Sequence, residues 1–240
     1  MSTLFRELAY QETPIGAVSL RQRRILALDT DVLEIMLGDE HLMSSLFTAS
    51  EIALAKFGIA ALDGNNLDVV VGGLGLGYTA KAVLEDVRVG SLTVVELLDP
   101  VVDWHEQGLL PLGPVLTGDD RTRFHRGDFF ALAAGQTGFD AAQPGRQFDA
   151  ILIDIDHTPD RLLDDRSTGF YSETGLRALS GHLRNGGVMG LWSDEPPDAA
   201  FLDRLSAVFA SAWAEPVTFD NPYQPGQPVT QTVYFARKAG

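Results

Sequence analysis

Three closely spaced glycines, Gly73, Gly75 and Gly77, follow a β-branched run of valines at 69–71. A helix is predicted to begin directly after them. Glycine lets the backbone turn tightly and approach a ligand closely, so this order of strand, glycines and helix is typical of a nucleotide-binding loop. The alternative interpretation is a glycine turn in an ordinary α/β protein.

Acidic residues stand at the ends of the next two predicted strands. Glu96 ends one strand about twenty residues after the glycines, a spacing that suits hydrogen bonds to a ribose diol. Asp128 follows the next strand and can accept a hydrogen bond from an adenine amino group. Asp is also favoured as a helix N-cap, and both roles can hold at once.

A third carboxylate, Asp154, ends a strand that is apolar without alternation, as a central parallel strand should be. A carboxylate that leaves such an interior needs a partner or a role. Burial would raise its pKa, so Asp154 is a candidate general base. Asp156 and His157 crowd the same loop, and His157 either exchanges protons near neutral pH or is an ordinary loop histidine.

Two aromatic residues lie near predicted element ends on the same side of the sheet. Tyr171 and Trp192 can stack on a base or line a substrate pocket, and core packing is favoured for Trp192. No HxxxH or HExxH spacing accompanies the acidic residues, so we predict no metal site.

Length and composition exclude several classes of protein. The chain has 240 residues with 45% hydrophobic content, no cysteine and a net charge of −15. That charge opposes binding to a phosphate backbone. No apolar run is long enough to span a bilayer, and the first residues lack a signal-peptide core. We predict a soluble cytoplasmic protein without a nucleic-acid or membrane partner.

The elements that must position these residues follow two patterns. Residues 1–40 alternate and turn, which predicts short antiparallel strands. From about Asp39 to Phe57 the apolar spacing predicts a helix, which 63–66 interrupts.

Beyond residue 66, strands and helices alternate, and this predicts a parallel sheet covered on both faces. In such a sheet a ligand binds outside the carboxyl ends of the strands, where the strand order switches. A closing hairpin is predicted near 217–236. Strands are predicted at 68–72, 92–96, 122–125, 149–154 and 187–192, and helices near 77–86, 100–108, 128–134, 172–184 and 198–212.

These residues, followed by the segment LRNGGV at 183–188, resemble the class I S-adenosylmethionine-dependent methyltransferase superfamily. Within it the chain is most similar to the spermidine synthase-like branch, over nearly its whole length. The hairpin at 1–40 is similar to the small β-domain of that branch, and 148–154 is similar to the strand carrying its catalytic aspartate. The segment 170–172 loosely matches a later tyrosine-bearing segment.

The resemblance implies a role for each of these residues. The loop from Gly73 to Gly77, including Gly75, would hold the sulfonium and the tail of the donor. Glu96 would bind the ribose and Asp128 the adenine, and Asp154 would deprotonate the attacking amine. We assign acceptor binding to Asp156, His157 and Tyr171, and the resemblance further implies a homodimer.

The chain departs from that branch where a cationic amine would bind. Gly75 replaces an acidic residue of the glycine loop, and His157 replaces a second aspartate. In that branch a Tyr-His-Glu run follows an Asp-Glu pair. Here the pair is Asp39-Glu40, and residues 43–45, Met-Ser-Ser, stand where the run is expected. The nucleoside-binding half is therefore kept and the polyamine half is altered.

We therefore predict an α/β protein with a Rossmann-like seven-stranded methyltransferase fold. A β-hairpin region at 1–40 precedes an S-adenosylmethionine-binding domain at 41–240. The predicted activity is methyl transfer from S-adenosylmethionine to a small acceptor, an amine. One alternative is aminopropyl transfer from decarboxylated S-adenosylmethionine in polyamine biosynthesis. Others are a nucleoside-binding protein without catalysis and a nicotinamide-dependent oxidoreductase.

Overall fold

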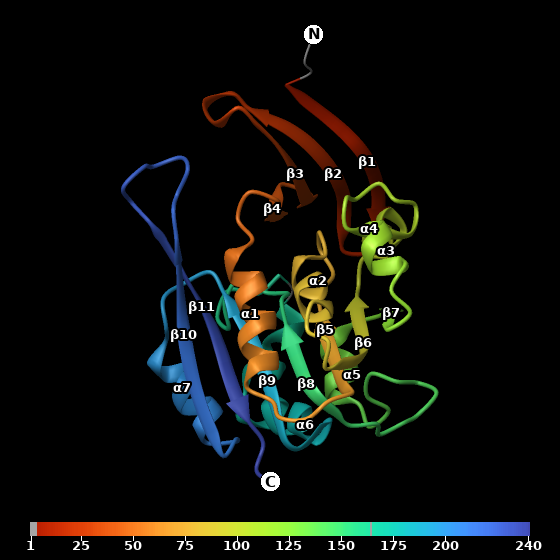
Figure 1. Ribbon diagram of the computed structural model, residues 1–240, viewed down its shortest axis with the longest axis vertical. Coiled ribbons are helices and arrows are strands. Elements are labelled where there is room, and N and C mark those ends of the chain that lie inside the picture. The colour runs from red at the N-terminus through yellow and green to blue at the C-terminus, as the bar shows by residue number, and fades with distance from the viewer. Residues whose placement is uncertain (1–3, 164) are drawn as a thin grey trace.

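The computed structural model describes residues 4–163 and 165–240, with the side chains of 165 and 166 left out of the description. Two sheets make up the molecule, and the smaller lies across one end of the larger (Figure 1). The smaller sheet is antiparallel throughout, in the order β1-β2-β3-β4. Its strands are β1 (Phe5–Thr13), β2 (Gly16–Ile25), β3 (Thr30–Leu37) and β4 (Glu40–Ser44), with a short 3-10 turn η1 (Leu26–Leu28) before β3.

The helix predicted from about Asp39 is wrong in its first part. Residues 40–44 form β4, which pairs with β3 through Ile35 opposite Met43 and Leu37 opposite Glu40. The helix α1 (Ala49–Ala60) begins later and ends before the predicted break. The prediction was wrong because apolar spacing alone does not distinguish a short strand from a helical turn. In the folded chain, residues 40–44 are a strand because they pair with β3.

The larger sheet has seven strands in the order β10-β11-β9-β8-β5-β6-β7. The strands from β9 to β7 are parallel, whereas β11 is antiparallel to both β9 and β10. This arrangement confirms the predicted Rossmann-like methyltransferase fold with its antiparallel C-terminal hairpin. The strands are β5 (Leu67–Gly72), β6 (Val89–Glu96), β7 (Thr122–Arg126), β8 (Phe148–Ile153), β9 (Leu183–Ser193), β10 (Ser211–Phe219) and β11 (Val229–Arg237).

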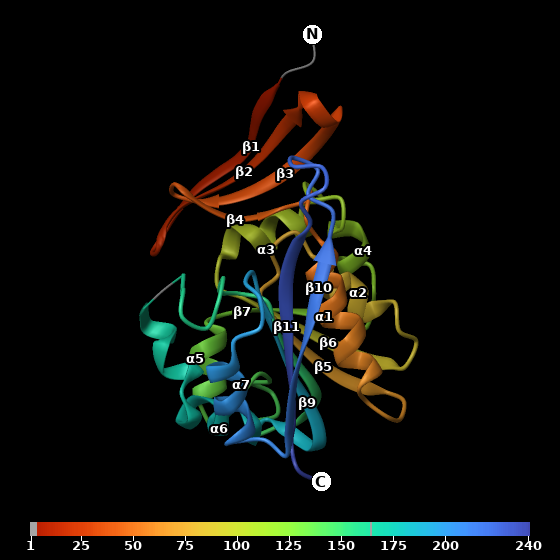
Figure 2. The same cartoon turned by 90° about the vertical axis from the view of Figure 1, so that its left-hand side faces the viewer.

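Helices cover both faces of the larger sheet (Figure 2). One face carries α1, α2 (Tyr78–Leu84), α3 (Asp99–Glu106) and α4 (Gly113–Thr117). The other face carries α5 (Phe129–Ala134), α6 (Glu173–Gly181) and α7 (Ala199–Ser206), and the 3-10 segment η2 (Asp165–Tyr171) precedes α6.

The central strand β8 explains why the fold has two cores. Ala150 and Leu152 pack into the core beneath α1 and α2, whereas Ile151 and Ile153 pack into the core beneath α5 and α6. Successive side chains of a strand point to opposite faces, so a strand buried on both faces reads as a continuous apolar run.

The C-terminal part differs from the prediction at the ends of two helices. The helix predicted at 172–184 ends at Gly181, and β9 begins at Leu183. The helix predicted at 198–212 ends at Ser206, and the residues from Ser211 onward form β10. The short helix α4 lies in a segment where no element was predicted. Among the described residues, no helix combines the length and the apolar character needed to cross a membrane.

Candidate functional site

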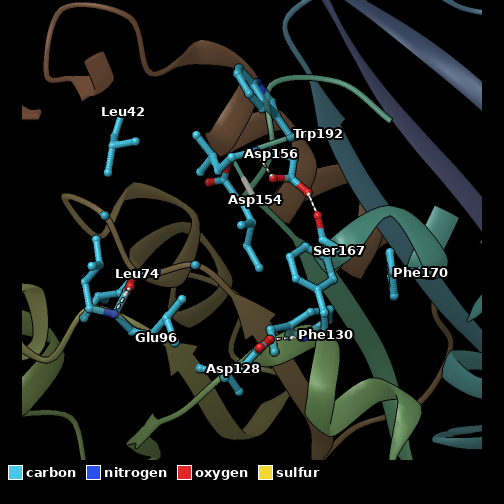
Figure 3. A pocket seen from close by; sticks show the side chains of 18 of the residues that line it. Leu42, Leu74, Glu96, Asp128, Phe130, Asp154, Asp156, Ser167, Phe170 and Trp192 are labelled. Atoms are coloured by element: carbon cyan, nitrogen blue, oxygen red, sulfur yellow. Dashed lines mark hydrogen bonds between the residues drawn. The ribbon is translucent and has the colours of Figure 1, made fainter. Parts of the chain in front are cut away.

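A cavity of about 800 Å³ lies between the two sheets, at the carboxyl ends of the parallel strands (Figure 3). The strand order switches here, because β5 has β6 on one side and β8 on the other. Most of the predicted site residues line the cavity, namely Gly73, Gly75, Glu96, Asp128, Asp154 and Asp156. Gly77, His157 and Tyr171 do not belong to its lining.

The glycine loop leaves β5 and passes close to the end of β8. Gly73 has a φ of +90°, and a Cβ at this position would collide with the carbonyl oxygen of Asp154. Its amide donates to Val95 O at 2.9 Å, which continues the pairing of β5 with β6. Gly77 also has a positive φ and begins α2. Only glycine allows the backbone this approach, so the sequence reading of the loop has a direct structural cause.

Glu96 is buried at the end of β6 and ties that strand to the glycine loop. Its Oε2 accepts from Leu74 N at 2.9 Å, and its Oε1 accepts from Leu98 N at 2.8 Å. Burial raises the pKa of Glu96, and these backbone hydrogen bonds act in the opposite direction. Glu96 also lines the cavity, so its carboxylate lies beside any ligand bound there.

Asp128 caps the N-terminus of α5. Its Oδ1 accepts from Phe130 N at 2.9 Å and from Ala131 N at 3.1 Å. Both hydrogen bonds use the same oxygen, which leaves Oδ2 for a ligand. The sequence analysis allowed Asp128 to be both a helix N-cap and a contact to adenine, and this geometry is compatible with both roles.

Aromatic side chains that sequence reasoning did not select surround this part of the cavity. Phe130 and Phe170 line it with their ring centroids 5.0 Å apart. Phe130 comes from α5 and Phe170 from η2, and Figure 3 shows Phe130 beside Asp128. Their chain separation explains why no sequence motif joins them. The two rings give Asp128 an apolar surrounding that suits the binding of a flat heterocycle.

Asp154 follows directly on β8 and contacts the cavity. Its Oδ2 accepts a hydrogen bond of 2.6 Å from the hydroxyl of Thr79 on α2. Burial raises the pKa of Asp154, and the Thr79 hydrogen bond lowers it less. A carboxyl group in this state is suited to accept a proton close to neutral pH.

A second carboxyl group, Glu51, was missed by sequence reasoning. It lies in the first turn of α1, is only 7% exposed and lines the cavity. Burial and the nearby charge of Asp154 raise the pKa of Glu51. The hydroxyl oxygen of Ser50 lies 2.9 Å from Glu51 Oε2 and 2.6 Å from Gln231 Oε1, either of which can accept its one hydrogen, and it accepts from the indole N–H of Trp192 at 2.8 Å.

A signal for Glu51 was present in the sequence. Thr48 and Glu51 have the T-x-x-E spacing of a capping box, which marks a helix start. Thr48 is indeed the N-cap of α1, although its side chain makes no capping hydrogen bond. Glu51 lines the cavity, so the helix start places a carboxyl group in the site.

The three residues assigned to acceptor binding have partners within the protein. Asp156 is 3% exposed and accepts from Leu163 N at 2.8 Å and from the Tyr171 hydroxyl at 2.7 Å. Ser167 also contacts it, as Figure 3 shows. His157 Nε2 lies 3.3 Å from Glu40 Oε1 on β4. These contacts hold the loop after β8 in place, and a role in acceptor binding stays a prediction.

An apolar wall closes the cavity on the side of the smaller sheet. It consists of Ile15, Ile35, Leu37, Leu42 and Met43. The Met43 sulfur accepts from Leu76 N at 2.8 Å and so joins β4 to the glycine loop. Trp192, favoured as a core residue, packs against the core with one part and lines the cavity with another.

Charge is distributed unevenly around the cavity. Five carboxyl groups line it, those of Glu51, Glu96, Asp128, Asp154 and Asp156, and no described lining residue is basic. Such a cavity favours a cationic ligand. Among the described side chains, no group of three or more His, Asp or Glu residues is placed to hold a metal ion.

Neither a protein-family model nor a curated protein matches the chain. Solved structures do. Spermidine synthase from Thermotoga maritima is 16% identical with a TM-score of 0.69, over 98% of this chain and 73% of that one. A spermidine synthase in complex with the transition-state analogue AdoDATO is also 16% identical, with a TM-score of 0.71 over 98% and 74%.

Human methyltransferase-like protein 13 in complex with SAH is 19% identical, with a TM-score of 0.56 over 80% of this chain and 82% of that one. At such identities the likeness establishes the fold. The fold is thus that of the spermidine synthases and of a class I methyltransferase, and the fold that the sequence resemblance implied is confirmed.

Proposed function

We propose that the protein transfers a methyl group from S-adenosylmethionine to a small acceptor, with an amine nitrogen as the nucleophile. One observation carries the proposal. The glycine loop, Glu96 and Asp128 line the same cavity as Asp154, which can accept a proton. The fold is shared with structures that bind AdoDATO and SAH, which is consistent with such a donor.

The donor would occupy what we call the donor end, formed by Gly73, Gly75, Glu96 and Asp128. Glu96 would accept hydrogen bonds from the ribose hydroxyls, and Asp128 Oδ2 from the adenine amino group. The base would lie among Phe130 and its neighbours. The surrounding carboxyl groups favour the positive sulfonium.

The acceptor would occupy the opposite part, the acceptor end, formed by Glu51, Asp154 and the apolar wall. The lone pair of the amine nitrogen attacks the methyl carbon, the carbon–sulfur bond breaks, and its electron pair returns to sulfur. An acceptor that binds as an ammonium first passes one proton to Asp154, which frees this lone pair, and after the transfer the methylated nitrogen carries the positive charge. Because the sulfonium is already a good leaving group, positioning and proton removal are the main tasks of the protein.

The glycine loop favours methyl transfer over aminopropyl transfer. A side chain at Gly75 would collide with the Met43 sulfur, and the φ of +47° there disfavours residues other than glycine. The loop therefore lacks the carboxylate with which the spermidine synthase-like branch holds the amine of its aminopropyl donor.

A second candidate is aminopropyl transfer from decarboxylated S-adenosylmethionine, which would place the protein in polyamine biosynthesis. The charge of the cavity favours it. S-adenosylmethionine carries a carboxylate into a cavity whose described charged side chains are all acidic, and the decarboxylated donor avoids that repulsion.

Calorimetry with S-adenosylmethionine, decarboxylated S-adenosylmethionine and methylthioadenosine tests both candidates. Tighter binding of the carboxylated donor, with methyl transfer to an amine, is the expected result. Tighter binding of the decarboxylated donor would support aminopropyl transfer instead. Binding without turnover on any amine would support a nucleoside-binding protein. A homodimeric state and a cytoplasmic location stay predictions.

A further inference from the structure

We propose that the acceptor is an amphipathic monoamine, a single protonable nitrogen on an elongated apolar body. Its nitrogen would lie at Glu51 and Asp154, and its body would lie along the apolar wall of the smaller sheet. The inference rests on the proposed function and specifies the substrate class of the same site. The cavity volume of about 800 Å³ leaves room for an acceptor beside a donor.

The nitrogen-binding position follows from the two carboxyl groups of the acceptor end. Thr79 connects their elements, because its hydroxyl donates to Asp154 Oδ2 at 2.6 Å and lies 3.4 Å from the backbone carbonyl of Glu51. Two neighbouring carboxyl groups with few hydrogen-bond donors resist simultaneous ionisation. A single ammonium placed between them relieves that repulsion, and a neutral or anionic acceptor does not.

The apolar body follows from what faces these carboxyl groups. Ile35, Leu37, Leu42 and Met43 come from β3 and β4, and Trp192 approaches from β9. In Figure 3, Leu42 and Trp192 lie on the same side of the cavity as Asp154. These side chains offer contact to methylene groups or a ring.

The wall provides no described partner for a second positive charge. No acidic residue of β3 or β4 belongs to the cavity lining, and Glu34 and Glu40 pair with Arg23 and His157. A second ammonium on the acceptor would lose its hydration against apolar side chains without a compensating hydrogen bond. Diamines are therefore disfavoured relative to monoamines of the same length.

A matched pair of amines tests the inference. n-Heptylamine and hexane-1,6-diamine have equally long chains and differ only in a terminal methyl against a terminal ammonium. Calorimetry in the presence of saturating S-adenosylhomocysteine should show n-heptylamine binding at least about tenfold more tightly. Equal binding, tighter binding of the diamine, or no binding of either amine would overturn the inference.

A charge placed in the wall should reverse the preference. Leu42→Asp should raise the affinity for hexane-1,6-diamine and lower that for n-heptylamine, whereas the uncharged Leu42→Asn should only weaken n-heptylamine. Leu26→Asp is the matched control, since Leu26 lies between β2 and β3 of the same smaller sheet but is 71% exposed and outside the cavity. An unchanged ratio in Leu42→Asp would contradict the inference.

Failure of the inference and failure of the proposed function give different results. Tight binding of n-heptylamine without transfer from either donor would refute the transferase and leave the acceptor class standing. Faster transfer to hexane-1,6-diamine than to n-heptylamine would refute the acceptor class and leave the transferase standing.

Discussion

The donor end and the acceptor end of the cavity hold their carboxyl groups in different ways. Glu96 and Asp128 each accept two backbone N–H bonds. Asp154 accepts a bond from the side-chain hydroxyl of Thr79, and the carboxyl group of Glu51 lies 2.9 Å from the hydroxyl of Ser50. Backbone donors are fixed by the fold, so the donor end is preorganised, whereas carboxyl groups at the acceptor end can change their protonation.

This difference matches the tasks proposed for the two ends. A group that binds a ribose must keep its position, and a group that accepts a proton must change its charge. Substitutions at the two ends should therefore change different quantities, donor affinity at one end and turnover at the other.

The largest effect is expected from Asp154→Asn, which removes the proposed base while keeping its shape. Turnover should fall by about 10²–10⁴-fold, because the amine proton loses its acceptor. Donor affinity by calorimetry should stay close to that of the unaltered protein. Asp203→Asn, at an exposed position of α7, is the control. Full turnover in Asp154→Asn would show that Asp154 is not the base and would assign that role to Glu51.

Glu96→Gln should weaken donor binding without a specific effect on the chemical step. The amide has only one accepting oxygen, so the bond from Leu74 N or from Leu98 N is lost together with the charge. A weakening by about 1.5–3 kcal/mol is expected for hydrogen bonds to a charged group, measured as the dissociation constant of the donor. Glu173→Gln on the exposed surface of α6 should change nothing, and an unaffected donor affinity in Glu96→Gln would refute the ribose role.

The acceptor end should make stability depend on pH. Because the pKa of Glu51 is raised by burial and by Asp154, the folded chain holds its proton above the ordinary carboxyl pKa. Its contribution is complete below the pKa of the unfolded chain and is lost as pH rises through the raised pKa. The free energy of unfolding in urea should thus fall between pH 5 and pH 8, by on the order of 1–2 kcal/mol from this group.

Glu51→Gln removes that titration and should flatten the profile by the same amount. Asp154 should keep its raised pKa, because burial and not the charge of Glu51 raises it. If Glu51→Gln and the unaltered protein had parallel profiles, the two carboxyl groups would not be coupled in the folded chain.

The smallest effect separates the two roles of Asp128. Asp128→Asn keeps an N-cap of equal quality but replaces Oδ2 by an N–H group that cannot accept a hydrogen bond. It should therefore weaken the binding of the methyl donor several-fold, with little change in stability. Asp128→Ala should cost about 1 kcal/mol of stability as well. Asp198→Ala removes the equivalent cap of α7, outside the cavity, and should lower stability alone. If Asp128→Asn left the affinity for the methyl donor unaltered, Asp128 would act only as the N-cap of α5.

The sequence placed the residues of the donor end at one edge of the sheet because each of its parts is local, and their role in donor binding stays a prediction. A buried parallel strand is a continuous apolar run, its end is marked by the first glycine or acid, and the register of the sheet aligns these ends. Gly72 stands opposite both Val95 and Ile153, so Gly73, Glu96 and Asp154 reach the same edge. No long-range information beyond the parallel arrangement was needed.

The acceptor end was predicted poorly because its parts depend on pairing between distant segments. The apolar spacing from Leu42 to Phe57 covers both β4 and α1, and only the pairing of β4 with β3 separates them. The capping-box spacing at Thr48 would have located the helix start and thus Glu51. The apolar wall has no sequence signature at all, since it forms only when the smaller sheet meets the larger one.

The hydrogen bond from the Trp192 indole to Ser50 gives the cavity an intrinsic optical reporter. Of the tryptophans in the sequence, Trp104 is buried in the core and Trp213 lies against Phe235, and neither lines the cavity. A molecule that reaches Glu51 must alter the polarity around the Trp192 ring. The fluorescence of Trp192 in a variant that combines Trp104→Phe and Trp213→Phe would therefore follow the occupancy of the cavity directly, without a label.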